Sequence, residues 1–94
     1  MSELEQYQQM IVPVLRKYMI KRAAIFGSFA KREAHSKSDM DILIEPEKGF
    51  TMFKFLELEM EISELIKRKV DLVEFSAIKP SIKNEVLATA INIL

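Results

Sequence analysis

The sequence contains no cysteine, no tryptophan, two glycines and three prolines among its 94 residues. The lack of cysteine excludes a disulfide framework and any thiolate metal site, and it favours a reducing compartment. The scarcity of glycine and proline leaves little material for long flexible linkers, and the hydrophobic share of 49% is well above that of disordered chains. We therefore expect one domain over 1–94, with a modest core.

The sequence also lacks net charge, because fourteen basic and fourteen acidic residues cancel. We expect no direct DNA binding and no attraction to an anionic membrane, so any polyanion must be held by a local site. There is no apolar run of about 18 residues, the length that a membrane-spanning helix needs. The polar, acidic stretch 1–6 differs from a signal peptide, and we expect a cytoplasmic protein.

Hydrophobic periodicity predicts the element order αβαβαβα, which is typical of a small α/β (α+β) fold with helices packed on a mixed sheet. Pro13 interrupts the first helix, and we expect a kink or a fresh turn there. The predicted elements are a helix over 4–18, a strand over 23–26, a short helix over 28–34, a strand over 40–44, a helix over 52–66, a strand over 70–73 and a closing helix over 82–94.

Aspartates gather on or beside two of the predicted strands. Asp39 and Asp41 lie two apart at the start of one strand, so their side chains project to the same face, and Asp71 joins them if the next strand pairs alongside. Carboxylates crowded in this way repel one another unless a cation is bound. Oxygen ligands without His or Cys favour magnesium, which proteins commonly hold together with substrate phosphates.

A second feature is Gly27-Ser28, at the end of the first predicted strand. Gly27 has no Cβ and lets the backbone approach a ligand closely, while Ser28 at a helix start offers a hydroxyl and free backbone N–H groups. The pair is suited to holding an anion, and Lys31, Arg32 and Lys37 would add positive charge around it.

Taken singly, each of these features has an ordinary structural explanation. Gly27-Ser28 is consistent with a turn and a helix cap, Asp39 and Asp41 with a solvated loop, and Asp71 with a charge that protects an edge strand. The combination favours a site, because an aspartate between Val and Leu in a strand needs a partner. We expect His35 to be a surface residue and 67–69 to be a solvated turn.

These residues resemble the signature of the minimal nucleotidyltransferases of the DNA polymerase β superfamily. That signature is Gly-Ser, ten residues, then Asp-x-Asp, and here positions 29–38 supply the ten between Gly27-Ser28 and Asp39-Met40-Asp41. The segment 69–73 resembles the later strand of the family, which carries a third carboxylate at Asp71. The resemblance implies a Mg-dependent nucleotidyltransferase with a mixed sheet, two magnesium ions and a nucleoside triphosphate as donor.

The resemblance also implies roles for individual residues. Asp39, Asp41 and Asp71 would be the catalytic and metal-binding residues, with Asp71 also helping to take the proton from the attacking hydroxyl. Gly27, Ser28 and Lys31 would bind the nucleotide. The family usually has Arg then Gly where this chain has Lys31 then Arg32, and Arg32 costs about 1 to 2 kcal/mol if the position needs a positive φ.

The acceptor is the least determined part of the prediction. Small members of the family resemble antitoxins that attach AMP from ATP to an all-helical HEPN ribonuclease toxin, so we expect such a partner protein, with a homo-oligomer also possible. The short chain has little left to cover the nucleobase, and the apolar residues of 90–94 offer a surface for a partner. Alternatives are a subunit that modifies a small molecule such as an antibiotic, and a module that blocks a toxin without catalysis.

Overall fold

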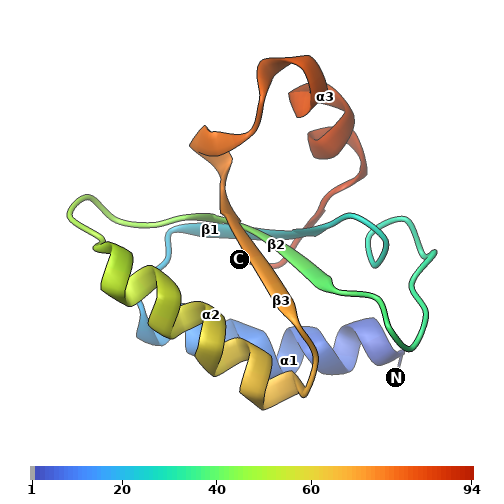
Figure 1. The fold of residues 1–94 in the computed structure, drawn as a ribbon, viewed down its shortest axis with the longest axis horizontal. Coiled ribbons are helices and arrows are strands. Elements are labelled where there is room, and N and C mark those ends of the chain that lie inside the picture. Colours follow the sequence, from blue (N-terminus) through green and yellow to red (C-terminus); the bar gives the residue numbers. More distant parts are fainter. Residues whose placement is uncertain (1) are drawn as a thin grey trace.

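The computed structural model describes residues 2–94, which form a four-stranded mixed sheet with helices on both faces (Figure 1). The strand order is β3-β2-β1-β4. The elements are α1 (Glu3–Lys17), β1 (Arg22–Phe26), β2 (Met40–Glu45), α2 (Met52–Ile66), β3 (Val70–Glu74), the 3-10 helix η1 (Phe75–Ala77), α3 (Pro80–Thr89) and β4 (Ile91–Asn92).

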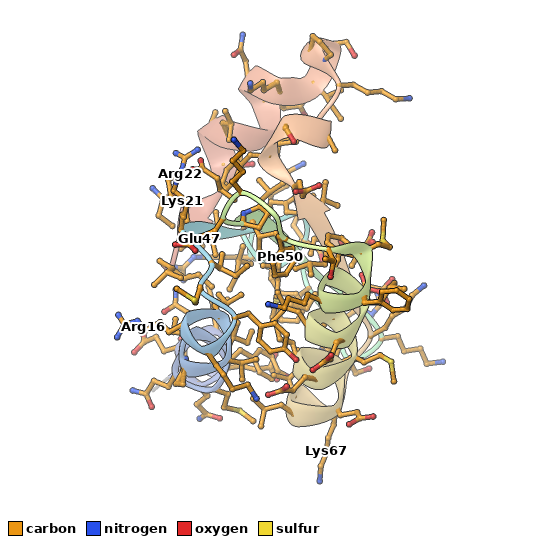
Figure 2. All side chains as sticks on the ribbon, turned by 90° about the vertical axis from the view of Figure 1, so that its left-hand side faces the viewer. Arg16, Lys21, Arg22, Glu47, Phe50 and Lys67 are labelled. Atoms are coloured by element: carbon orange, nitrogen blue, oxygen red, sulfur yellow. The ribbon has the colours of Figure 1, made fainter. Side chains whose placement is uncertain are left out.

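Helices α1 and α2 lie side by side on one face of the sheet, and α3 stands over the opposite face (Figures 1 and 2). The main core lies between the helix pair and the sheet. Alternation along β2 builds it, because Met40, Ile42 and Ile44 point toward the helices and are fully buried. The helices contribute Ile11, Leu15, Leu58 and Ile62.

The pairing register brings the ends of three strands together. β1 and β2 are antiparallel with Phe26 opposite Asp41, and β2 and β3 are parallel with Asp41 opposite Asp71. Gly27, which directly follows β1, therefore lies at the same end of the sheet as both aspartates. Because Asp41 alternates with core residues, it faces away from α1 and α2.

The fold class agrees with the sequence prediction, but two predicted helical segments are wrong. Residues 27–32 form a series of turns in place of the short helix, so Ser28 is not a helix cap. The closing helix ends at Thr89, and Ile91–Asn92 form β4 against β1. The edge of β1 offers hydrogen-bond partners to an extended segment, and a helical segment could not use them. Ala23 N–H, for example, donates to the carbonyl of Leu94 at 3.1 Å.

Pro13 does not start a fresh turn, because α1 runs without interruption from Glu3 to Lys17 with Pro13 inside it. Proline at this position removes the hydrogen bond to the carbonyl of Gln9. Both Pro13 and Gln9 are exposed, so water can satisfy that carbonyl. Within residues 2–94, no helix has the length and apolar character to cross a membrane.

Candidate functional site

The site begins where Gly27 meets the carboxylate of Asp41. Gly27 has a φ of +72°, and a Cβ placed on it would lie 2.2 Å from Oδ2 of Asp41. No side chain fits at that distance, and L-residues rarely adopt that φ. The sequence predicted that Gly27 lets the backbone approach a ligand. The structure gives a more specific reason, because the missing Cβ leaves room for the carboxylate of Asp41.

The three predicted aspartates lie at this end of the sheet. Asp41 is partly buried, and Asp71 is its exposed neighbour on the adjacent parallel strand. Asp39 precedes β2 and has a side chain that is 46% exposed. The structure therefore brings Asp41 and Asp71 side by side, as the strand pattern predicted, with Asp39 at the entrance to the strand.

The electrostatics of the site centre on Asp41, which lies close to two other carboxylates. The pKa of Asp41 is raised from its ordinary value of 3.8 to about 6, first by burial, then by repulsion from Asp71 and from Asp39. A divalent cation would remove this repulsion, and three carboxylates are a ligand set that suits magnesium. The chemistry of these three side chains therefore fits magnesium.

The side chains are not all turned toward one ion position. Among residues 2–94, no group of three or more acidic or histidine side chains is arranged to share a metal. Asp39 instead faces Lys69, with Oδ2 3.8 Å from Nζ. Both side chains are largely exposed, so this ion pair is worth little and does not fix Asp39 in place.

Residues 27–33 form a tight turn beside the aspartates. The carbonyl of Gly27 accepts a hydrogen bond from Lys31 N–H at 3.1 Å, and the carbonyl of Ser28 accepts one from Glu33 N–H at 2.8 Å. Lys31 is exposed, in agreement with a role as a free positive charge. Arg32 has a φ of +59°, so the residue adopts the left-handed conformation that the sequence analysis considered for this position.

Arg68 was not identified from the sequence, which predicted a solvated turn at 67–69. Its guanidinium donates to three backbone carbonyls of the loop that leads into Asp39. The acceptors are His35 at 3.1 Å, Ser36 at 3.3 Å and Ser38 at 2.6 Å. All three contacts come from Nη1, which has two N–H groups, so at least one N–H is shared between two carbonyls. Arg68 therefore ties the loop before Asp39 to the end of α2.

The same guanidinium also contacts aromatic side chains. It lies 5.0 Å from the ring centroid of Phe29 and 5.8 Å from that of Tyr7, and its Nε donates to the Tyr7 hydroxyl at 3.4 Å. Phe29 belongs to the turn after Gly27, so Arg68 joins both loops of the site. His35, predicted to be a surface residue, is exposed, and its Nδ1 accepts a hydrogen bond from Lys37 N–H at 3.2 Å.

The sequence profile of the family described as "Polymerase beta, Nucleotidyltransferase" matches residues 9–94. The chain belongs to the polymerase β nucleotidyltransferase family. The matched range contains the whole candidate site, from Gly27 to Asp71. The resemblance inferred from the Gly-Ser and Asp-x-Asp motifs is confirmed, and the chain is a nucleotidyltransferase.

Relatives of known name or structure agree with this assignment. The chain is 34% identical over 91 residues to a Methanocaldococcus jannaschii protein provisionally named a protein adenylyltransferase, covering 97% of this chain and 98% of that one. It superposes with a TM-score of 0.82 and 28% identity on a structure provisionally described as a minimal nucleotidyltransferase, covering 94% and 90%. The nucleotidyltransferase fold class is confirmed.

A third similarity is in the fold alone. A chain in the structure of a tri-AMPylated Shewanella oneidensis HEPN toxin in complex with an MNT antitoxin superposes with a TM-score of 0.74 at 17% identity. The match covers 96% of this chain and 71% of that chain.

Proposed function

We propose that this nucleotidyltransferase transfers AMP from ATP to a hydroxyl of a partner protein, as the antitoxin of a HEPN-type toxin in the cytoplasm. The observation that carries the proposal is the pairing of Asp41 with Asp71 on adjacent strands, with Gly27 making room for the Asp41 carboxylate. The similarity to a named protein adenylyltransferase over almost the full length supports a protein acceptor.

The proposed roles follow from the position of each residue. Asp39 and Asp41 would hold two magnesium ions, with Asp71 as a further ligand. Bound magnesium would neutralise charge on the phosphate oxygens during transfer. Asp71 is exposed, so an acceptor hydroxyl can reach it and pass its proton to the carboxylate.

The other side of the site would hold the triphosphate. The turn at Gly27 and Ser28 presents backbone N–H groups, and Lys31 adds an exposed positive charge. In the reaction, the acceptor oxygen forms a bond to the α-phosphorus of ATP, the bond to the bridging oxygen breaks, and pyrophosphate leaves. The chain contributes orientation and electrostatics to this reaction.

Exposed apolar side chains support association with another protein. The sequence prediction placed this surface on a closing helix over 82–94, but Ile93 and Leu94 pack against the core. The exposed residues lie mainly along α2, where Phe53 is 85% exposed. Burial of such a surface would favour a complex. We propose first that a helical partner protein covers this surface, and second that another copy of this chain covers it in a homo-oligomer.

The test has two parts. Calorimetry with ATP should show binding that weakens sharply when EDTA replaces magnesium, and equal affinity in both conditions would contradict a shared metal and phosphate site. The purified chain, ATP and a co-encoded helical partner should then produce a partner whose mass increases by one or more AMP groups. An unmodified partner that still forms a complex would favour toxin blocking without catalysis, and AMP on an added aminoglycoside would favour a small-molecule acceptor.

A further inference from the structure

A cavity of about 310 Å³ lies between the sheet and α3, directly beside the candidate site. Phe26, Leu43 and Val73 line it from β1, β2 and β3, and Ile78, Ile82 and Val86 line it from α3 and the segment before it. Asp71 forms part of the same wall. The cavity is therefore continuous with the aspartate site and is made entirely by this chain.

The helix over this cavity is packed loosely. None of the residues of α3 is buried, and Ile82 is 46% exposed although it lines the cavity. Figure 1 shows α3 alone on its face of the sheet, whereas α1 and α2 share the other face. Leu43 is fully buried but lies outside the main core cluster. The apolar residues on this side form a second layer with space left between them.

We infer that this cavity binds the nucleobase of the triphosphate donor; the inference rests on the proposed function. Its volume is near the lower end of the range of about 300 to 1,000 Å³ that ligand pockets show, which suits one flat ring system. Apolar walls with one aromatic side chain, Phe26, suit the face of a base. Phe26 directly precedes Gly27, so a triphosphate bound at the turn has its base within reach of the cavity.

The residues that line the cavity also indicate how well the site distinguishes one nucleobase from another. Of the residues that line it in the described chain, only Asp71 and Lys79 carry charge. A pocket with few polar groups cannot reject a base by leaving hydrogen-bonding groups unpaired. We expect ATP and GTP to differ in affinity by less than about tenfold. In this proposal the chain supplies its own wall for the base, whereas the short length of the sequence predicted that a partner would provide it.

The decisive experiment is an NMR titration of methyl-labelled protein with three probes. Mg-ATP should shift the methyl signals of Ile82 and Val86 and the amide signals of Gly27 and Ser28. Mg-tripolyphosphate, which has no base, should shift only the amides, and adenosine should shift only the methyls. Methyl signals that do not respond to Mg-ATP while the amides do would overturn the base pocket and would leave the proposed function standing.

The same titration separates the two proposals in the opposite case. Amides that respond to neither phosphate probe would contradict the proposed function, and a methyl response to adenosine would then retain the cavity as a nucleoside site. No response to any probe would overturn both. Methyls that respond only when the protein partner is added would overturn the base pocket in favour of an acceptor side chain.

A pair of variants on α3 provides an independent check. Val86→Trp fills the cavity and should weaken Mg-ATP binding about tenfold without changing the affinity for Mg-tripolyphosphate. Leu87→Trp is the matched control, since Leu87 is 41% exposed and does not line the cavity. If Val86→Trp lowers the melting temperature, the same binding measurements are made with Val86→Leu, which is a milder substitution. Equal Mg-ATP affinity in the folded variant and the wild type would overturn the inference.

Discussion

Oδ2 of Asp41 occupies the space beside Gly27 where any other residue would carry its Cβ, only 2.2 Å from the ideal Cβ position. The glycine directly follows β1 and the aspartate lies on β2, and the antiparallel register of β1 and β2 brings them together. The Gly-Ser and Asp-x-Asp motifs are therefore one physical unit. The glycine allows the turn, and it also allows the carboxylate of Asp41 to lie against the backbone.

Substitution of Gly27 tests this relationship. Gly27→Ala should lower the free energy of unfolding by about 1 to 2 kcal/mol from the positive φ alone, with a further cost because Asp41 must move. Transfer activity should fall at least about tenfold, since the displaced carboxylate no longer fits the metal. Thermal unfolding and an AMP-transfer assay measure both effects.

Gly49 provides the matched control. It has a φ of +91° but nothing within 4 Å of an added Cβ, so Gly49→Ala has the backbone strain without the clash. We expect Gly49→Ala to lose stability and keep its activity. Equal losses of stability and activity in the two variants would show that contact with Asp41 is unimportant.

Arg68 should position the loop before Asp39 and make no contact with the substrate. Arg68→Met removes the contacts of one charged Nη1 with three loop carbonyls and should lower the free energy of unfolding by about 2 kcal/mol. The apparent affinity for magnesium should weaken and kcat should fall more than KM changes, because Asp39 is no longer held near Asp41. Lysine lacks the planar arrangement of donors, so Arg68→Lys should rescue little.

Lys67→Met is the control for Arg68, because it removes a neighbouring charge that makes no loop contact in the described residues. Its magnesium affinity should equal that of the wild type. If Arg68→Met retained full magnesium affinity and kcat, the arginine would be a structural residue only.

The aspartate site could be predicted because its signals are local. Spacing by two places Asp39 and Asp41 on the same side of one strand, and a short apolar run marks the strand that carries Asp71. That these two strands pair side by side was a further assumption, and the parallel register of Asp41 with Asp71 agrees with it. The same residues predicted a phosphate-bearing substrate, and the family resemblance implied a nucleoside triphosphate.

The features that could not be predicted depend on contacts between distant segments. Arg68 lies in a basic run, and only the packed structure shows that its side chain turns toward Phe29 and Ser38. The apolar segment 90–94 suits a helix by composition, but the free edge of β1 makes it extended. The turn after Ser28 likewise depends on the close approach of Gly27 to Asp41.

Arg32 should be a site where stability can be gained. Its φ of +59° is left-handed, and glycine there avoids a strain of about 1 to 2 kcal/mol, partly offset by the greater freedom of glycine in the unfolded chain. We expect Arg32→Gly to raise the free energy of unfolding by about 0.5 to 1 kcal/mol in urea titrations. Arg32→Ala keeps the strained position and should bring no gain. A less stable Arg32→Gly variant would mean that the arginine side chain makes a compensating contact.

Asp41→Asn should abolish transfer and make the metal-free protein more stable at neutral pH. The folded state raises the pKa of Asp41 from 3.8 to about 6, so folding favours the protonated form. As pH rises from about 4 to about 6, the unfolded chain loses this proton first, and wild-type stability falls. Asparagine cannot ionise, so the variant avoids this loss. Its advantage should be absent below pH 4 and complete above pH 6.

The size of this advantage is limited by solvent. Asp41 is only partly buried, so we expect about 1 kcal/mol at pH 7, or roughly 4 to 8 °C in melting temperature, less than the full shift of the pKa implies. Melting curves from pH 4 to pH 8 in EDTA measure it. Added magnesium should then stabilise the wild type and leave the stability of Asp41→Asn unchanged, because the variant has lost the carboxylate that would bind the ion. A variant less stable than the wild type at pH 7 in EDTA would mean that Asp41 is held by contacts stronger than the repulsion from Asp71 and Asp39.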